Sequence, residues 1–432
     1  MRARVVVQVV AVLAGAAFTF LAGWKYSDAS SAWQLAIRVE VEKAGVHQDE
    51  VRRVYANEGP LAFRVAVLEI RADALAPLGD KARTERTIAE NAAFAFRQAS
   101  GPTTLLGQER YTLPGGGSDL VHRLADAGRE RAKPLPDPEV PDREGDGAAR
   151  LAWWISVITV LVTGLAVFWA SVRGREPPLQ LLPQPGSAPR PERRLTFLLL
   201  AIWTAGVLFP LTQLYFSSQE QRYQADSARH AVQARSAESI SSTRTEFGVT
   251  ALQIAGEGGV AATAREIGAV YSDAQTAATA GELTRAEERA AIRSEAVAGA
   301  MARPPEQRDG VEPGLAGALT SEPHDWAVMK ALSDWEANNG DTFGTLSNTM
   351  LGLIGLVVLA EARFEVVAER RRQAQAAPPA DPLGRGRRWD RRTAGLLCLL
   401  LVVAAGVWLT QRTTDREWRA TPARAPGRRP GT

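Results

Sequence analysis

The sequence has few of the side chains that form disulfides, bind metals or act as nucleophiles. Its 432 residues include one cysteine, Cys398, and four histidines, at positions 47, 122, 230 and 324. A single cysteine cannot close a disulfide within the chain, so packing alone must hold the folded parts together. The histidines show no helical or loop spacing of metal ligands. The sequence therefore predicts no metal, no cofactor and no catalytic residue, and we expect a protein that is not an enzyme.

Lysine is also scarce, with five residues beside a large number of arginines. The formal net charge of +3 comes mainly from arginines in short stretches next to uncharged blocks. A basic surface for nucleic acid would instead gather its charge on a folded domain. We therefore expect no nucleic-acid partner, and we attribute the bias toward arginine and alanine to a GC-rich bacterial genome.

Charged residues are missing from the interior of five hydrophobic stretches. The rest of the chain is arranged around Leu195–Phe216, about 22 residues without a charge, which is long enough to cross a bilayer as a helix. Arg190, Arg193 and Arg194 precede this stretch. Together with four similar stretches, it predicts transmembrane helices at residues 1–24, 151–172, 195–216, 343–360 and 394–410.

The basic loops between the spans set the orientation, because cytoplasmic loops carry an excess of arginine. Residues 173–194 contain five arginines and residues 361–393 contain nine, so both loops are predicted to be cytoplasmic. Residues 25–150 and 217–342 then face outward, as does the basic tail 411–432. The prediction is a multi-pass protein of the cell membrane with most of its ordered sequence extracytoplasmic.

The first hydrophobic stretch has two interpretations. Small residues near Ala22 would allow cleavage of a signal peptide. The stretch is longer than a usual signal-peptide core, however, and Trp24 and Tyr26 resemble the aromatic anchors of a membrane interface. We therefore favour a signal anchor that is retained.

The outward segment 25–150 alternates between strand-like and helix-like patterns. Residues 35–41 alternate apolar and polar side chains, as does part of 61–70, although the latter stretch also fits a helix. Further patterns predict a helix over 80–99, a strand over 103–113 and a helix over 119–131. This order favours a small α/β domain, followed by an acidic, proline-rich linker at 133–147.

Two glycine-containing stretches are expected to interrupt helices. A short helix over residues 49–57 should end at Gly59-Pro60, and the glycines of 256–259 should break a longer one. The glycines of 115–117 and 256–259 lack the Lys-Ser/Thr that follows a phosphate-binding loop, so we interpret them as turns or hinges.

The outward segment 217–342 is acidic, rich in alanine and glutamine, and predicted to be helical. Ile240, Phe247 and Ile254 recur every seven residues and predict a helix-packing seam. Further helices are expected over 261–278, 282–301 and 325–337.

Two patterns suggest a site, and in each the structural interpretation is preferred. The acidic group from Asp334 to Asp341 resembles a calcium loop, but its glycine comes one position late and Thr345 stands where a glutamate is needed. We favour a polar turn. His122 and His324 each have a carboxylate nearby in sequence, as many histidines in large domains do, so neither is assigned as a base.

The function we expect is that of a non-enzymatic bacterial membrane protein. Its two cytoplasmic loops are too short for a kinase or cyclase domain, and its spans lack buried ionisable residues of the kind that carriers use. Binding of a protein or an envelope component by the outward segments is the leading hypothesis. An accessory or sensing subunit of a transporter or signalling complex is the alternative, and an extracytoplasmic hydrolase is least favoured. The expected partners are membrane lipids and either another protein or further copies of the chain.

Overall fold

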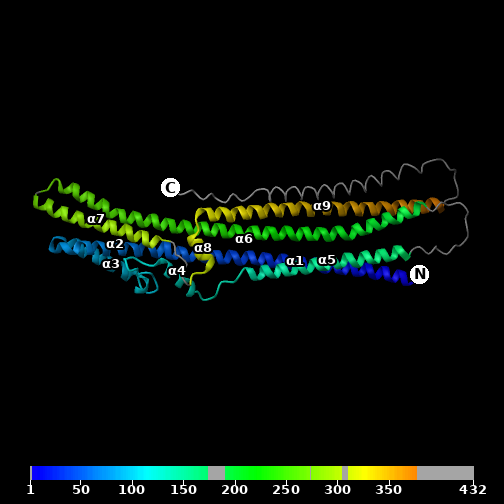
Figure 1. The fold of residues 1–432 in the computed structure, drawn as a ribbon, viewed down its shortest axis with the longest axis horizontal. Coiled ribbons are helices and arrows are strands. Elements are labelled where there is room, and N and C mark those ends of the chain that lie inside the picture. Colours follow the sequence, from blue (N-terminus) through cyan, green and yellow to red (C-terminus); the bar gives the residue numbers. More distant parts are fainter. Residues whose placement is uncertain (1, 174–189, 273, 304–309, 377–432) are drawn as a thin grey trace, which may run out of the picture. The chain divides into compact units, whose positions relative to one another are not determined.

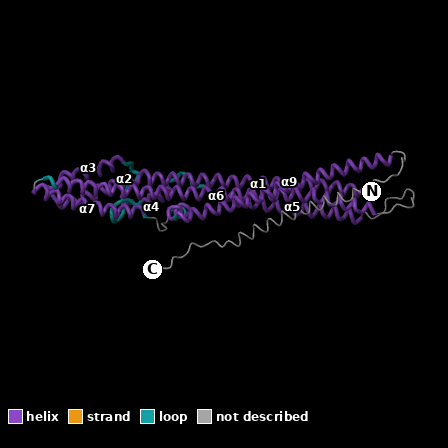
Figure 2. The backbone as a smooth tube through the Cα atoms, turned by 90° about the horizontal axis from the view of Figure 1, so that it is seen from above, coloured by secondary structure: helices purple, strands orange, loops and turns teal. Residues whose placement is uncertain are grey.

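The computed structural model describes residues 2–173, 190–272, 274–303 and 310–376. These residues are almost wholly helical, with short π and 3₁₀ turns between longer helices (Figure 1, Figure 2). The elements are α1 (Arg2–Val51), η1 (Arg52–Glu58), α2 (Gly59–Leu75), η2 (Ala76–Ala82), α3 (Arg83–Ala99), η3 (Glu109–Tyr111), α4 (Leu120–Arg129), α5 (Glu139–Arg173), α6 (Arg190–Ala269), α7 (Ala274–Ala302), α8 (Pro313–Thr320) and α9 (Pro323–Ala376).

The α/β domain predicted for residues 25–150 is wrong. In the part of the chain that the structure describes, there is no named strand, and the pairing of Thr112 with Ser118 is an isolated bridge. Residues 35–41 belong to α1 and residues 61–70 to α2, so the helical alternative for the second stretch is the correct one.

The alternating pattern at 35–41 led to a wrong prediction because its apolar residues are not the ones on the buried face of the helix. Leu35 and Val41 are half exposed, whereas Trp33, Ala36 and Glu40 are buried at helical spacing. A few apolar residues on a solvent-facing helix surface can imitate a strand over seven positions, because period two and period 3.6 are hard to separate in so short a window.

Two helical segments are long and apolar enough to cross a membrane, among the residues whose side chains the structure describes. They are Glu139–Leu165, which includes residues 151–165 of the second predicted span, and Pro323–Ala360, which includes the whole of the fourth, so two of the five predicted spans are supported. The most apolar part of Glu139–Leu165 is 17% buried, and that of Pro323–Ala360 is 33% buried. The core helix of a soluble protein would be mostly buried, so neither segment resembles one. The fifth predicted span, 394–410, lies outside the described residues.

The chain divides into two compact units. The first contains Met1–Ser30, Gly145–Arg222 and Asn339–Thr432, and the second contains Ser31–Glu144 and Tyr223–Asn338. In the first unit α6 and α9 meet where the rings of Phe216 and Phe343 lie 6.1 Å apart. Both predicted outward segments contribute to the second unit, which is the part of the molecule that carries the candidate site.

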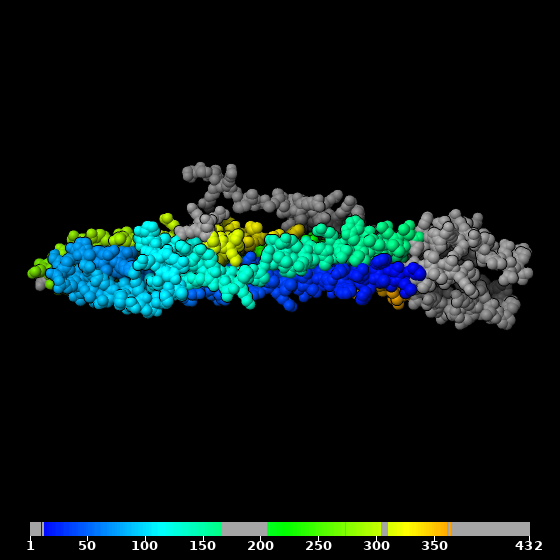
Figure 3. Space-filling view, turned by 90° about the horizontal axis from the view of Figure 1, so that it is seen from below, coloured from blue at the N-terminus to red at the C-terminus, as the bar shows by residue number. Residues whose placement is uncertain are grey.

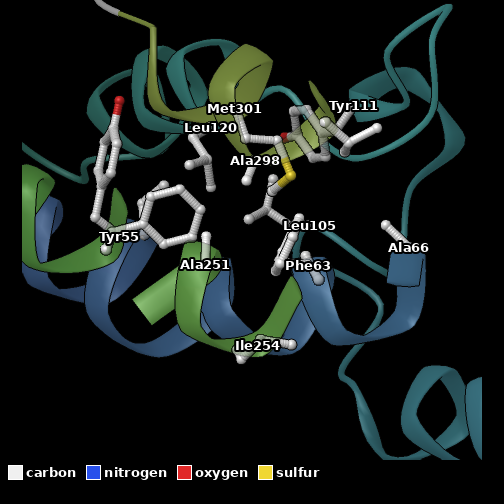
Figure 4. Close-up of a cluster of buried hydrophobic side chains, with 14 of the residues drawn as sticks. Tyr55, Phe63, Ala66, Leu105, Tyr111, Leu120, Ala251, Ile254, Ala298 and Met301 are labelled. Atoms are coloured by element: carbon white, nitrogen blue, oxygen red, sulfur yellow. The ribbon is translucent and has the colours of Figure 1, made fainter. Parts of the chain in front are cut away.

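One hydrophobic core joins the two halves of the second unit. Residues 51–124 supply Val51, Phe63 and Leu120, and residues 240–319 supply Phe247, Met301 and others to the same cluster (Figure 4). α2 packs against both α3 and α7. The seam predicted from Ile240, Phe247 and Ile254 is confirmed, since all three are buried in this core. The two segments therefore form one folded body.

The helix does not end at Gly59-Pro60, contrary to prediction. Proline has no backbone N–H and its ring crowds the preceding turn, which usually kinks or ends a helix. Here the chain passes through the π turn η1 before it and continues as α2. A Cβ at Gly59 would lie 3.0 Å from the Phe247 ring, so glycine lets α6 approach closely.

The glycines of residues 256–259 do not break a helix either, because α6 continues to Ala269. Isolated glycines cost a helix about 1 kcal/mol each relative to alanine, and packing outweighs this penalty when one face is buried. Ala251, Ile254 and Ala255 before the glycines, and Ala262 after them, are buried. The helix therefore persists through a sequence that is locally unfavourable to it.

A buried ion pair connects η1 with α4. The guanidinium of Arg123 is fully buried and donates from Nε to Glu58 Oε2 at 3.1 Å, and from Nη1 to Glu130 at 3.4 Å. Glu58 also accepts from the backbone, since Leu105 N–H donates to Oε2 at 3.0 Å, and its Oε1 lies 3.3 Å from Arg53 Nε. Burial disfavours the charged guanidinium, but its hydrogen bonds to Glu58 outweigh this and raise the pKa of Arg123.

A second buried carboxylate joins α2, α6 and α7. Glu287 lies between Arg71 and Arg265, each with a nitrogen 2.6 Å from one of its oxygens. Its side chain is only 3% exposed, and a carboxylate that is buried in this way needs such partners. These pairs fix the rotation of α7 against its neighbours.

A third polar cluster ties the start of α8 to α1. His47 Nε2 lies 2.6 Å from Glu312 Oε2, and Arg131 bridges Glu312 to Glu50 with contacts of 3.2 and 2.8 Å. Burial lowers the pKa of His47 and outweighs the opposing effect of Glu312. Burial also opposes ionisation of Glu312, but its bonds from His47 and Arg131 lower its pKa overall.

The lowered pKa of His47 predicts that acid destabilises the second unit. The unfolded chain takes up a proton at this histidine near its ordinary pKa of about 6.5, before the folded chain does. The contribution of His47 to stability is thus complete above that pH and is lost as the pH falls below it. We expect thermal unfolding of the full chain in lipid nanodiscs to show a smaller loss of stability on acidification in His47→Gln than in the wild type.

The matched control is His324→Gln, which changes an exposed histidine of α9. It should keep the pH profile of the wild type. A His47→Gln variant with the full wild-type acid dependence would show that the burial of this imidazole does not control stability.

Candidate functional site

The site lies where residues 100–119, a long and mainly non-helical stretch of the second unit, return to the bundle. Tyr111 anchors the stretch, because its ring is buried and its hydroxyl donates to Asp126 Oδ2 at 2.7 Å. Arg110 and Arg123 lie over the same ring, 4.9 and 6.0 Å from its centroid. Residues 100–130 form a continuous part of the surface of this unit, coloured cyan in Figure 3.

A tight turn at residues 113–117 follows Tyr111. Leu113 N–H donates to Gly117 O at 3.1 Å, and Gly116 N–H donates to Leu113 O at 3.0 Å. Gly116 and Gly117 have φ values of 91° and 82°, a conformation that residues with a Cβ rarely adopt. The interpretation of this glycine cluster as a turn is confirmed.

Glycine is also required at 117 because the turn presses on α7. A Cβ built there would lie 2.6 Å from Val297 Cγ1 and 2.9 Å from Met301 Sδ. Gly115, two residues earlier, has open space around it. The turn therefore packs most tightly against α7 at Gly117, whereas Gly115 has free space around it.

A cleft of about 740 Å³ opens between this turn, the start of α4 and α7. Its volume falls within the range of about 300–1,000 Å³ that is usual for small-molecule sites. The α7 side is one helical stripe, in which Ala296 and Ala300 alternate with larger residues and leave room. The lining residues are Leu113, Pro114, Gly115, Gly116, Ser118, Asp119, Leu120, Val121, Arg293, Ala296, Val297, Ala300, Met301 and Arg303.

The exposed lining of the cleft is mainly polar, with an apolar patch on α7 and two arginines at the edge. Arg293 and Arg303 line it and are exposed, and neither forms an ion pair with a residue that the structure describes. Asp119 is the acidic residue of the lining, but it caps α4 by accepting a hydrogen bond from His122 N–H at 3.0 Å. This arrangement suits a molecule that has an apolar body and an anionic group.

The histidines singled out in the sequence are not arranged for catalysis. His122 Nε2 is 3.9 Å from Asp126 Oδ2, which is beyond hydrogen-bond distance. That oxygen already accepts from the Tyr111 hydroxyl and lies 2.8 Å from Arg110 Nη2. Burial would raise the pKa of Asp126, but the hydrogen bond from Tyr111 and the nearby arginines lower it overall. His324 lies exposed at the start of α9, apart from the cleft residues.

The acidic group from Asp334 to Asp341 forms neither a calcium loop nor a polar turn. It lies within α9, where successive side chains point in different directions. Glu336 instead accepts from His230 Nδ1 at 2.7 Å, next to a hydrogen bond between Ser227 and Ser333. In the searched part of the chain that the structure describes, no cluster of three or more metal-type ligands occurs.

The cleft residues were not identified from the sequence. The available signals were the glycines of 115–117 and the small residues Ala296 and Ala300, which share one face of a predicted helix. Neither signal shows that the two stretches meet, because the contact joins residues about 180 positions apart in the chain. No sequence motif identifies a fold that would bring them together. Comparisons with protein-family models, curated proteins and solved structures found no match.

We predict that Gly117→Ala destabilises the second unit by about 1–3 kcal/mol, because alanine is strained at positive φ and its Cβ collides with Val297. Relief of the collision would lift the turn from α7 and reshape the cleft. Gly115→Ala, with free space and an ordinary φ, is the matched control and should stay close to the wild type. Denaturant unfolding of both variants measures the difference, and equal stabilities would contradict this account of the turn.

Proposed function

We propose that this protein is a non-enzymatic membrane protein whose second unit faces outward and binds an envelope component. The observation that carries the proposal is the cleft beside α7, with its apolar patch and its two arginines. The ligand class that fits is a small amphiphilic anion, in which a carboxylate, sulfate or phosphate group is attached to an apolar body.

The membrane part of the proposal rests on the two apolar helical segments and on the arginine distribution. Glu139–Leu165 and Pro323–Ala360 expose most of their apolar surface, which lipid would cover. With the hydrophobic stretches at 1–24, 195–216 and 394–410, they give the five-span arrangement with cytoplasmic arginine-rich loops.

A role as a sensing or accessory subunit is the second candidate. It is favoured by the way helices are shared, since α1, α5, α6 and α9 each have residues in both units. A ligand held against α7 would bias the packing of the second unit, from which these four helices continue into the first. Output would require a partner protein, because the arginine-rich loops are short.

Ligand binding is tested with 2-naphthoate as the probe, on the full chain in zwitterionic nanodiscs. Isothermal titration should detect binding by the wild type and loss of about tenfold in affinity when Arg293 and Arg303 are both changed to alanine, since each exposed arginine contributes about 0.5–1 kcal/mol to holding the anion. Neutral 2-naphthalenemethanol should lose little from the same change.

Arg289→Ala is the matched control. Arg289 is an exposed arginine one turn earlier on α7, it donates to its own helix at Arg285 O, and it does not line the cleft. The affinity of the Arg289→Ala variant for 2-naphthoate should equal that of the wild type. Undiminished binding by the double variant would rule out the cleft as the anion site.

The proposed orientation is tested with single cysteines in a Cys398→Ser background. Cysteines at Thr84 and Ser272, both exposed in the second unit, should react with an impermeant maleimide in intact cells. Cysteines at Ser187 and Gln375, in the predicted cytoplasmic loops, should react only after permeabilisation. The reverse pattern would place the second unit in the cytoplasm and overturn the proposal.

A further inference from the structure

The α7 side of the cleft has a covered part and an open part. Val297 and Met301 are 6% and 2% exposed, because the turn at Gly117 packs on both of them. The lining residues on this side that stay exposed are, in chain order, Arg293, Ala296, Ala300 and Arg303. A molecule in the cleft therefore contacts α7 along these four residues, which we name the open row.

The open row follows one face of the helix. Its spacings of three, four and three residues keep successive side chains on that face at 100° per residue. Val297 and Met301 each come one residue after an alanine of the row and are turned by 100° toward the side where the turn packs. The two alanines thus form an uncharged floor that connects the two arginines.

The arginines lie at opposite ends of this floor. The nine residues from Arg293 to Ala302, the last residue of α7, rise by about 14 Å, and Arg303 follows directly. A charge-assisted hydrogen bond spans only about 2.9 Å. One carboxylate would reach both guanidinium groups only if both side chains bent inward, which would bring two positive charges close together. The arginines are therefore two separate contacts for anions.

The acidic residues near the cleft do not occupy these contacts. Asp119 accepts a hydrogen bond from His122 N–H as the cap of α4. Glu295 is turned by 200° from Arg293 on the helix and does not line the cleft. Among the residues that the structure describes, Arg293 and Arg303 have no ion-pair partner. Both cationic ends of the row are thus available to a ligand.

We propose that the cleft binds an elongated dianion, in which an apolar body carries one anionic group at each end. One group contacts Arg293, the other contacts Arg303, and the body lies over Ala296 and Ala300. This inference rests on the proposed function, because it specifies which anions the same cleft accepts. A dianion with both charges at one end satisfies only one of the two arginines.

Two isomers of one compound test the proposal by isothermal titration of the full chain in zwitterionic nanodiscs. In 2,6-naphthalenedicarboxylate the carboxylates are at opposite ends of the rings, and in the 2,3 isomer they are adjacent. The isomers share the same body and total charge, so only the placement of the charges differs. The 2,6 isomer should bind several-fold more tightly than both the 2,3 isomer and 2-naphthoate. Equal affinities for the two isomers would overturn the proposal.

Single variants test whether both ends are used. Arg293→Ala and Arg303→Ala should each weaken binding of the 2,6 isomer by about two- to fivefold, to near the affinity of 2-naphthoate. Each should weaken 2-naphthoate less, because the remaining arginine can still contact its one carboxylate. Arg289→Ala, one turn earlier and outside the lining, should leave binding of the 2,6 isomer unchanged. Dependence of the 2,6 isomer on only one arginine of the row would contradict the proposal.

A change in the floor tests the path between the arginines. Ala300→Leu obstructs the floor at an exposed position, so the variant should keep its melting temperature and lose the preference for the 2,6 isomer over the 2,3 isomer. Ala278→Leu is the matched control, since Ala278 is exposed on α7 outside the lining. It should keep the preference. A wild-type preference in Ala300→Leu would show that the ligand does not cross the floor.

The same titrations separate this inference from the proposed function. If the wild type binds none of the three probes, or if the double variant lacking Arg293 and Arg303 binds all of them undiminished, the cleft is not the anion site and both proposals fail. If the double variant loses affinity for every probe while the wild type binds the two isomers equally, the cleft accepts anions without requiring two ends. In that case only the present inference fails.

Discussion

The buried pair between Arg123 and Glu58 is the interaction on which the second unit depends. A guanidinium with no exposed surface requires a charged partner, and breaking such a pair costs about 3–5 kcal/mol because one charge is left uncompensated. The pair also sets geometry. Glu58 lies at the end of the π turn that accommodates Pro60, and its carboxylate holds both the start of α4 and the backbone of Leu105. One side chain therefore determines how the non-helical stretch returns to the helices.

The cleft follows from this anchoring. With α4 fixed by Arg123, Tyr111 is held between α4 and the core, and the chain between them must form the tight turn with Gly116 and Gly117. The turn meets α7 at Gly117, and the alanines of α7 leave the adjacent space open. The cleft is thus a product of two local features, a turn with glycines at positive φ and a helix face with small residues.

The sequence predicted what depends on composition and long-range periodicity. The helical nature of residues 217–342, the helix after Asp119 and the seam of Ile240 and Phe247 could be read directly, because a buried helix face repeats over many turns. The strands were wrong because the patterns behind them covered only seven to eleven residues, over which exposed apolar residues such as Leu35 mimic alternation. Gly59 and the glycines of 256–259 were expected to end helices, but tertiary packing on Phe247 and Ala262 overrides that local preference. The cleft could not be predicted, since it requires knowing that two remote stretches touch.

The shared core of the second unit has a consequence for the order in which the protein can assemble. Its residues come from two stretches, the first ending at Leu124 and the second at Leu319, which leaves the ribosome 195 residues later. The apolar faces of α2 and α4 gain their partners from α6, α7 and α8 only as residues 240–319 are made. The first half of the core therefore remains unpaired while both central hydrophobic stretches are synthesised. Assembly of this unit is coupled to synthesis of its second half, and a product truncated before that half would expose part of a core rather than retain one folded domain.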